Sequence, residues 1–163
     1  MLIRQLAATD AEDFRTIRLE GLRQHPEAFG ASFEEEAQLS VADFAARLTD
    51  STILDGFDAA GALQGIIGLT RGRMTKCRHI ATIWAVYLRP QARGTGLAAR
   101  LLDAAVTEAF RHCRSIRLSV TADNPRAHRL YRRAGFTDWA REHAALLVDG
   151  RFHDQILMRL DRT

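Results

Sequence analysis

The segment from residue 80 to residue 121 restricts the fold most, because it must place two strands side by side in the same direction. Residues 80–88 are almost continuously apolar, which is typical of a strand buried on both faces of a sheet. Pro90 ends this strand, and apolar residues then recur on one helical face over residues 96–112. Residues 115–121 alternate as a second strand. A strand, a crossover helix and a strand require a parallel pair within the sheet.

Before this segment, the sequence predicts a strand at residues 2–6 and two helices with capping boxes. Thr9 with Glu12 marks the start of the first helix, and Ser40 with Asp43 marks the start of the second. The other predicted elements are a loop or irregular helix at 29–39 and a hairpin of strands at 52–57 and 63–70.

After the parallel pair, the pattern predicts one more helix and a final hairpin. Asn124 is a good N-cap, Pro125 suits the first helical position and Gly135 suits the stop. Asp149-Gly150 then joins two strands, 136–148 and 152–160. We therefore expect one α/β (α+β) domain over residues 1–163, with a mixed, mostly antiparallel, twisted sheet of about six to seven strands and about four helices.

Composition excludes several classes of protein. Apolar residues make up 47% of the chain, yet no apolar run reaches the ~18 residues of a membrane helix. The N-terminus also lacks a signal-peptide core, so we expect a cytoplasmic protein without membrane partners. The two cysteines, Cys77 and Cys113, have no zinc-ligand spacing near them, and no metal is expected.

The net charge of +3 divides unevenly between the two parts of the chain. Residues 1–70 carry a net −7, and residues 71–163 carry a net +10. This asymmetry indicates ligands of opposite sign or, equally, a bias of composition on solvated faces. Arg126, Arg129, Arg132 and Arg133 lie on several faces of one short helix without a nucleic-acid motif, so nucleic acid is not expected as a partner.

A glycine-containing turn connects the buried strand to the amphipathic helix. Gly94 and Gly96 allow the backbone to turn tightly and approach a ligand, and the helix that follows presents free N–H groups and a positive dipole end. These features suit a phosphate or pyrophosphate, with Arg93 as an added cation. A dinucleotide pattern (Gly94, Gly96, Ala99) also matches, but the acidic residue that it needs about 20 residues later is absent.

Two motifs together resemble the GNAT N-acetyltransferase superfamily. Its pyrophosphate motif Q/R-x-x-G-x-G/A is filled by Gln91, Gly94 and Gly96. Its later signature N-x-x-A-x-x-L-Y-x-x-x-G-F is filled by residues 124–136, with Asn124 and Tyr131 on one helical face. The order of elements also matches to about residue 160.

The resemblance implies a splayed central parallel pair with acetyl-CoA in the gap. Tyr131 would be the general acid that protonates the departing CoA thiolate, and Asn124 would contact the pantetheine or thioester region. The implied acetyl-CoA contacts are the backbone near Val86 and Leu88, the motif residue Gln91, and a pyrophosphate cradle formed by the backbone amides of Arg93, Gly94, Thr95, Gly96, Leu97 and Ala98. A homodimer is a possible assembly, since pairing through the late strands is common in the family.

The general base and the acceptor are less defined. The position where many family members carry a strand Glu is Thr82 here, and no carboxylate lies between His79 and Leu88. A water chain or a more distant residue would act instead, with Glu20, Glu34, Glu35, Glu36, Glu142, His143 and His79 as the candidates. Predicted acceptor contacts are Phe29, Phe33, Glu34 and Trp84.

We expect transfer of acetyl to a primary amine of a small molecule, by direct attack within a ternary complex. Two alternatives are acetylation of a protein N-terminus or lysine, and a non-catalytic CoA-binding regulatory module. The charge split fits the enzyme hypotheses, because basic groups attract polyanionic CoA and the acidic N-terminal loops would attract a cationic amine.

Overall fold

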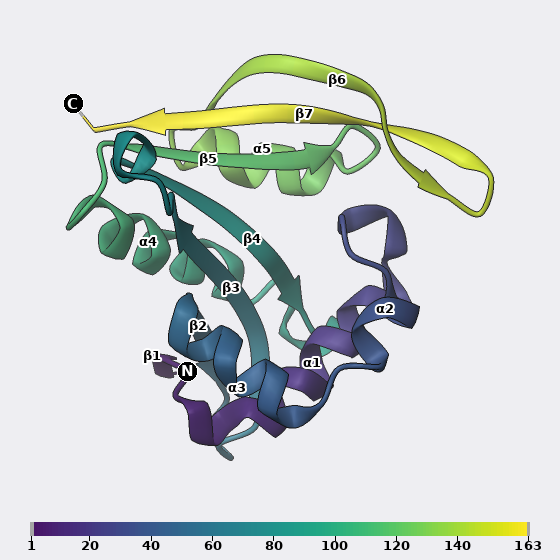
Figure 1. Ribbon diagram of the computed structural model, residues 1–163, viewed down its shortest axis with the longest axis vertical. Coiled ribbons are helices and arrows are strands. Elements are labelled where there is room, and N and C mark those ends of the chain that lie inside the picture. Colours follow the sequence, from purple (N-terminus) through teal and green to yellow (C-terminus); the bar gives the residue numbers. More distant parts are fainter. Residues whose placement is uncertain (1, 163) are drawn as a thin grey trace.

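One seven-stranded sheet forms the centre of the protein within residues 2–162, the part of the chain that the computed structural model describes (Figure 1). The strands are β1 (Leu2–Gln5), β2 (Thr52–Phe57), β3 (Leu63–Arg71), β4 (Ile80–Leu88), β5 (Ser115–Thr121), β6 (Thr137–Val148) and β7 (Arg151–Asp161). Their spatial order is β1-β2-β3-β4-β5-β7-β6. The β4–β5 pair is parallel and the other pairs are antiparallel, which confirms the mixed sheet.

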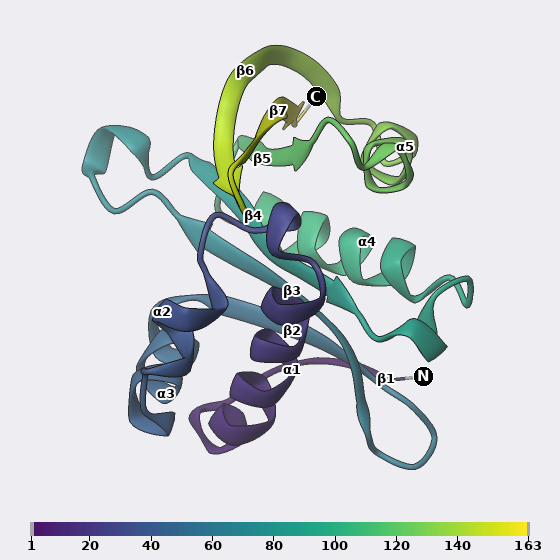
Figure 2. The ribbon, with the colours of Figure 1, turned by 90° about the vertical axis from the view of Figure 1, so that its right-hand side faces the viewer.

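Five α-helices in the described residues cover the two faces of this sheet, against about four expected. They are α1 (Ala11–Gln24), α2 (Phe33–Ala37), α3 (Val41–Asp50), α4 (Leu97–Phe110) and α5 (Pro125–Arg133). Helices α1 to α3 lie on one face, while α4 and α5 lie on the other (Figures 1 and 2). The sheet therefore separates two apolar cores.

The two cores follow from the helical periodicity. On one side, Leu101, Leu102 and Ala105 of α4 are at most 1% exposed and pack on the sheet. On the other side, Phe14 of α1 meets Phe44 of α3 edge to face, with ring centroids 5.5 Å apart. Each helix thus buries the apolar stripe that its sequence spacing predicts.

Helix starts were predicted correctly at one capping box and wrongly at another. The Ser40–Asp43 box is present, and the hydroxyl of Ser40 accepts from the Asp43 N–H at 3.2 Å. The Thr9–Glu12 box is not formed, because α1 is preceded by a 3₁₀ turn in which the carboxylate of Asp10 accepts from the Ala7 N–H at 2.8 Å.

Helix α2 is the helix that the prediction did not separate from the loop at residues 29–39. Its start is a third capping box, in which Ser32 and Glu35 satisfy each other's backbone N–H groups. The S-x-x-E spacing is visible in the sequence, so the signal for this short helix was available.

The parallel pair is joined over a short length only. Backbone pairing between β4 and β5 extends from Ile80 to Thr82 on β4, and beyond that point the strands diverge. A bulge lies in β4 near Ala85, whose φ is 53°, where the register with β3 shifts. A bulge bends and twists its strand, so it helps to turn β4 away from β5. The splayed pair expected from the family resemblance is therefore present.

Candidate functional site

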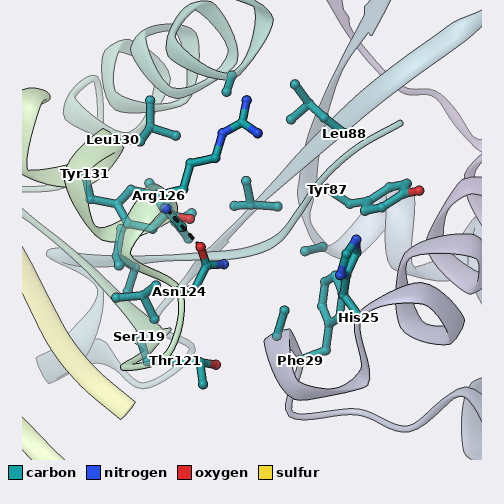
Figure 3. Close-up of a pocket in the computed structure, with 18 of the residues that line it drawn as sticks. His25, Phe29, Tyr87, Leu88, Ser119, Thr121, Asn124, Arg126, Leu130 and Tyr131 are labelled. Carbon is teal, nitrogen blue, oxygen red and sulfur yellow. Dashed lines mark hydrogen bonds between the residues drawn. The ribbon is translucent and has the colours of Figure 1, made fainter. Parts of the chain in front are cut away.

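A cavity of about 1060 Å³ extends along the gap between the diverging strands. Figure 3 shows its two sides, with Asn124 and Tyr131 facing Phe29 and His25 across the space. The walls come from β4 (residues 82–88), β5 (118–121), the segment before α2 (25 and 27–31), the glycine turn and α5. Its size and mixed lining are those of a ligand site.

The glycine turn lies at one end of this cavity, at the start of α4. Gly94 and Gly96 have φ values of 82° and 84°, a region that other residues seldom adopt. Nothing lies within 4 Å of where a Cβ would stand on either residue, so the space above the turn is free. Arg93, Gly94, Gly96 and Ala98 line the cavity at the helix N-terminus, a position that suits an anion.

Three of the predicted cradle residues do not line the cavity. Leu97 is 1% exposed and packs into the α4 core. Thr95 turns its hydroxyl back and donates to the carbonyl of Ala92 at 2.7 Å. Gln91 is exposed outside the cavity. Leu97 and Thr95 therefore shape the turn, and their side chains do not face the ligand space.

The same side of the cavity is strongly basic. Arg126, Arg129 and Arg133 of α5 line it, as does Arg93, whose Nη2 lies 2.9 Å from Nε2 of His25. A concentration of guanidinium groups raises the local concentration of anionic ligands. The basic C-terminal part of the chain therefore contributes its charge to this cavity.

Tyr131 lies on the wall of the cavity, two helical turns after Asn124. The residue is 5% exposed, and its ring meets Phe136 at a centroid distance of 6.0 Å. Burial raises the pKa of Tyr131 to about 12, so the phenol stays protonated throughout the physiological range. Its hydroxyl makes no hydrogen bond to any residue that the structure describes. A protonated hydroxyl without an internal acceptor can donate to a ligand.

Asn124 combines a structural role with a place on the cavity. Its side-chain oxygen accepts from the Ala127 N–H at 3.0 Å, the N-cap bond of α5 drawn as a dashed line in Figure 3. An amide whose oxygen is held in this way keeps its NH₂ group as a donor. Asn124 can therefore cap the helix and contact a ligand at the same time.

A second tyrosine of the cavity wall, Tyr87, differs from Tyr131 because its hydroxyl is hydrogen-bonded within the protein. Tyr87 donates to Oε1 of Glu20 at 2.7 Å, on helix α1. Burial and the hydrogen bond to Glu20 raise the pKa of Tyr87 to about 12. Because this hydroxyl is engaged with α1, Tyr87 is a poorer proton donor for a ligand.

The opposite wall holds two of the four predicted acceptor residues. Phe29 and Trp84 line the cavity, and the indole of Trp84 lies against Gly68, where a Cβ would be 2.7 Å from the ring. Phe33 and Glu34 do not line it. Phe33 instead lies under the guanidinium of Arg23 at 4.2 Å. Phe33 and Glu34 both belong to the first turn of α2, and the cavity-lining part of this segment ends before it, at Ala31.

The prediction missed Arg18, which also lines this wall. Arg18 is 5% exposed and forms a bidentate ion pair with Glu36, with both N–O distances 3.0 Å. The sequence carried a signal for a buried Arg18, because this residue lies four positions after Phe14 and four before Leu22, within the apolar stripe of α1. A charged residue at such a position needs a buried partner.

None of the seven residues considered as a general base lines the cavity. Glu36 forms ion pairs with Arg18 and Arg47. Glu20 forms an ion pair with Arg89 and accepts a hydrogen bond from Tyr87. The remaining five, Glu34, Glu35, Glu142, His143 and His79, lie on other surfaces. Among the lining residues, the side chains of the type that serves as a general base are those of His25, Glu27 and Asp123.

The expectation of an acidic acceptor side is wrong. Of the twelve acidic residues in the N-terminal part, all of them described, only Glu27 lines the cavity. The others point elsewhere or are paired internally, as Glu36 is. The described residues also contain no group of three possible metal ligands and no helix long and apolar enough to cross a membrane.

The comparisons with known proteins agree with this geometry. A family model described as "Acetyltransferase (GNAT) family" matches residues 14–136. An acetyltransferase of the GNAT family from Streptococcus pneumoniae superposes with a TM-score of 0.86 at 22% identity, over 99% of each chain. No curated protein sequence matches significantly.

Two other solved structures are similar over nearly the whole chain. A phosphinothricin acetyltransferase from Sinorhizobium meliloti, solved with acetyl-CoA, has a TM-score of 0.83 at 24% identity, covering 98% of this chain and 87% of its own. A ribosomal-protein-alanine N-acetyltransferase from Brucella melitensis has a TM-score of 0.82 at 21% identity, covering 99% of this chain and 100% of its own.

Proposed function

The chain belongs to the GNAT family of acetyltransferases and is an acyltransferase, and on that premise we propose that it transfers acetyl from acetyl-CoA to a primary amine of a small molecule. The observation that carries the proposal is the cavity between β4 and β5, with an anion cradle at one end and the free hydroxyl of Tyr131 on its wall. Tyr131 would act there as the general acid.

Acetyl-CoA would lie along the gap between the splayed strands. Its pyrophosphate suits the turn at Arg93, Gly94 and Gly96, where backbone N–H groups and the α4 dipole favour an anion. The edge of β4 that faces the gap, at Val86 and Leu88, is unpaired with β5 and can bond to the pantetheine amides. Asn124 would contact the thioester end.

The reaction would be a direct attack. The neutral amine nitrogen forms a bond to the thioester carbonyl carbon and then gives up a proton to solvent. The carbon–sulfur bond breaks, and the sulfur takes its proton from the hydroxyl of Tyr131. The CoA thiol has a lower pKa than a phenol, so proton transfer from Tyr131 to a free thiolate is uphill by itself. A phenol held beside the sulfur can still donate while the carbon–sulfur bond breaks, because the irreversible formation of the amide drives the step. Solvent then returns the proton to Tyr131.

The amine must lose a proton before or during attack, because an alkylamine has a pKa near 10.4. We infer that Glu27 accepts it, directly or through water. Glu27 lines the cavity beside Phe29, and its one ion-pair neighbour within residues 2–162 is His25 at 3.7 Å. Asp123 is less suited, because His153 and Arg151 already contact its carboxylate at 3.3 and 3.7 Å.

An activity screen distinguishes a small-molecule acceptor from a protein acceptor. The purified protein with acetyl-CoA is offered small primary amines, and peptides with a free N-terminus or lysine, while CoA thiol release is followed. We expect release above the rate of hydrolysis with small amines. Release with peptides alone would favour a protein acceptor. Tight CoA binding without release on any amine would instead favour a regulatory module.

A further inference from the structure

Arg18 has a donor group that its internal ion pair leaves unused. Nε and Nη2 donate to Oε2 and Oε1 of Glu36, which occupies one edge of the guanidinium. Nη1 is buried and has no hydrogen-bond acceptor among the residues that the structure describes. A buried N–H without an acceptor is costly, most of all on a charged group. Other atoms of Arg18 line the cavity, so Nη1 lies just behind its wall. A small rotation of the guanidinium would bring Nη1 to the cavity, where an occupant can supply the missing acceptor.

Two aromatic rings hold Arg18 in place at this wall. The guanidinium carbon lies 5.0 Å from the ring centre of Phe29 and 5.7 Å from that of Trp84. Trp84 Nε1 is also buried without an acceptor. Both unpartnered buried atoms that belong to cavity-lining residues are therefore donors. A ligand that reaches either of them must bring an acceptor, and one that carries only further donors would leave both unsatisfied.

The charge near Arg18 also favours an anion. Glu36 is shared between Arg18 and Arg47, whose Nη1 lies 3.1 Å from the same carboxylate oxygen. Two guanidinium groups and one carboxylate leave this cluster with a net positive charge. A polyamine would bring more positive charge to this wall, whereas a carboxylate would form charge-assisted bonds.

We propose that the acceptor is a primary amine that also carries a carboxylate, as an amino acid does, and that this carboxylate binds Nη1 of Arg18. This inference rests on the proposed transfer to a small amine and specifies its substrate class. Arg18 acts in binding, and the amine is placed toward the thioester by the anchoring of its carboxylate.

The first experiment compares matched amines. Glycine, alanine, methionine, phenylalanine and glutamate are each offered beside their α-carboxamides, which keep the amine and remove the charge of the α-carboxylate. We expect kcat/KM to be at least about tenfold higher for the best amino acid than for its amide, because a site built to bond one group rejects an analogue without it. Equal rates for acids and amides, or faster acetylation of polyamines, would overturn the inference.

The second experiment changes Arg18. Arg18→Lys keeps a cation for Glu36 but removes Nη1, so the preference for acid over amide should fall toward one. Arg47→Gln is the matched comparison, since it removes the outer cation of Glu36 and keeps Nη1 of Arg18, so it should lower the preference much less than Arg18→Lys does. If Arg18→Lys folds and keeps the full preference, the carboxylate binds elsewhere and the inference is wrong.

A binding measurement separates this inference from the proposed function. Calorimetry on the protein loaded with CoA measures binding of each amino acid and its amide without any turnover. We expect binding of the acid to be at least about tenfold tighter. If no amine is acetylated, the proposed function fails, and calorimetry alone still decides the carboxylate site. This measurement and the acid–amide comparison use the native chain, so they hold even if the Arg18 variant does not fold.

Discussion

At the scale of the residue, Tyr131 and Tyr87 both have a raised pKa but differ in what their hydroxyls contact. Burial raises the pKa of both Tyr131 and Tyr87 to about 12. The hydroxyl of Tyr87 is bonded to Glu20, whereas that of Tyr131 has no acceptor in the described residues. The family motif predicts a role for Tyr131, and the tertiary contacts make it the available proton donor.

Tyr131→Phe is therefore expected to lower kcat about 100-fold, the usual size of a general-acid contribution, while the Kd for acetyl-CoA changes little. Steady-state kinetics and calorimetry measure the two quantities. Tyr87→Phe is the matched control, and it should lower stability more than turnover because its hydroxyl bond is to α1. Equal losses of turnover and affinity in Tyr131→Phe would contradict the role.

Glu27→Gln tests the general base. We expect kcat to fall about 100-fold at pH 7 and the deficit to shrink as the pH rises toward the amine pKa near 10, where the amine no longer needs a base. The control is Asp123→Asn, which lines the same cavity but is already paired. A deficit that stays constant with pH would exclude Glu27 as the base.

At the scale of the element, the turn into α4 shows why both glycines are needed. Their positive φ values allow the loop to close, and the space where a side chain would stand is free. The requirement is therefore for conformation and for an unobstructed approach of the ligand. Close packing against the protein plays no part at these two positions.

Gly96→Val should weaken CoA binding by at least about tenfold, because a β-branched side chain strains a positive φ and enters the ligand space. Gly61→Val is a matched control, since Gly61 has a φ of 80° and equally free surroundings in the β2–β3 hairpin. Both variants should lose a similar amount of stability, on the order of 1–2 kcal/mol. Only Gly96→Val should lose affinity for CoA, and an unchanged Kd would contradict the cradle.

At the scale of the whole molecule, one buried carboxylate makes stability depend on pH. Asp55 of β2 is 0% exposed, and neither carboxylate oxygen has a hydrogen-bond partner in the described residues. Burial raises the pKa of Asp55 to about 7, and the nearby charges of Asp10 and Asp13 add to the rise while Arg4 opposes it. The folded state therefore keeps a proton that the unfolded state loses at lower pH.

Asp55→Asn should raise the free energy of unfolding more at pH 8 than at pH 4. The native side chain contributes no penalty below its unfolded pKa, and stability falls as the pH rises from about 4 to about 7. The difference in effect between the two pH values should be on the order of 3 kcal/mol. Urea unfolding measures it, with Asp103→Asn on the exposed face of α4 as the control. An equal effect at both pH values would contradict the raised pKa.

The unequal net charge of the N-terminal and C-terminal parts can be interpreted only in the folded molecule. The C-terminal part supplies Arg93, Arg126, Arg129 and Arg133 to the cavity, as expected for a polyanionic donor. Of the charged residues in the N-terminal part, the described cavity lining includes Arg18 and a single acid, Glu27. The other acids cap helices, pair internally or lie on other surfaces. Net charge along the chain does not report which side chains face a cavity.

The sequence by itself determined the order of the elements, the parallel pair, the glycine turn and the helix that carries Asn124 and Tyr131. These depend on local periodicity, capping residues and turn chemistry, which act between residues near in the chain. Only the tertiary structure decided that Arg18, Glu27 and Trp84 share a cavity while Phe33 and Glu34 do not. Those neighbours lie on different elements, and the packing of α1 on the bent strand β4 and of α2 on α1 sets their distances.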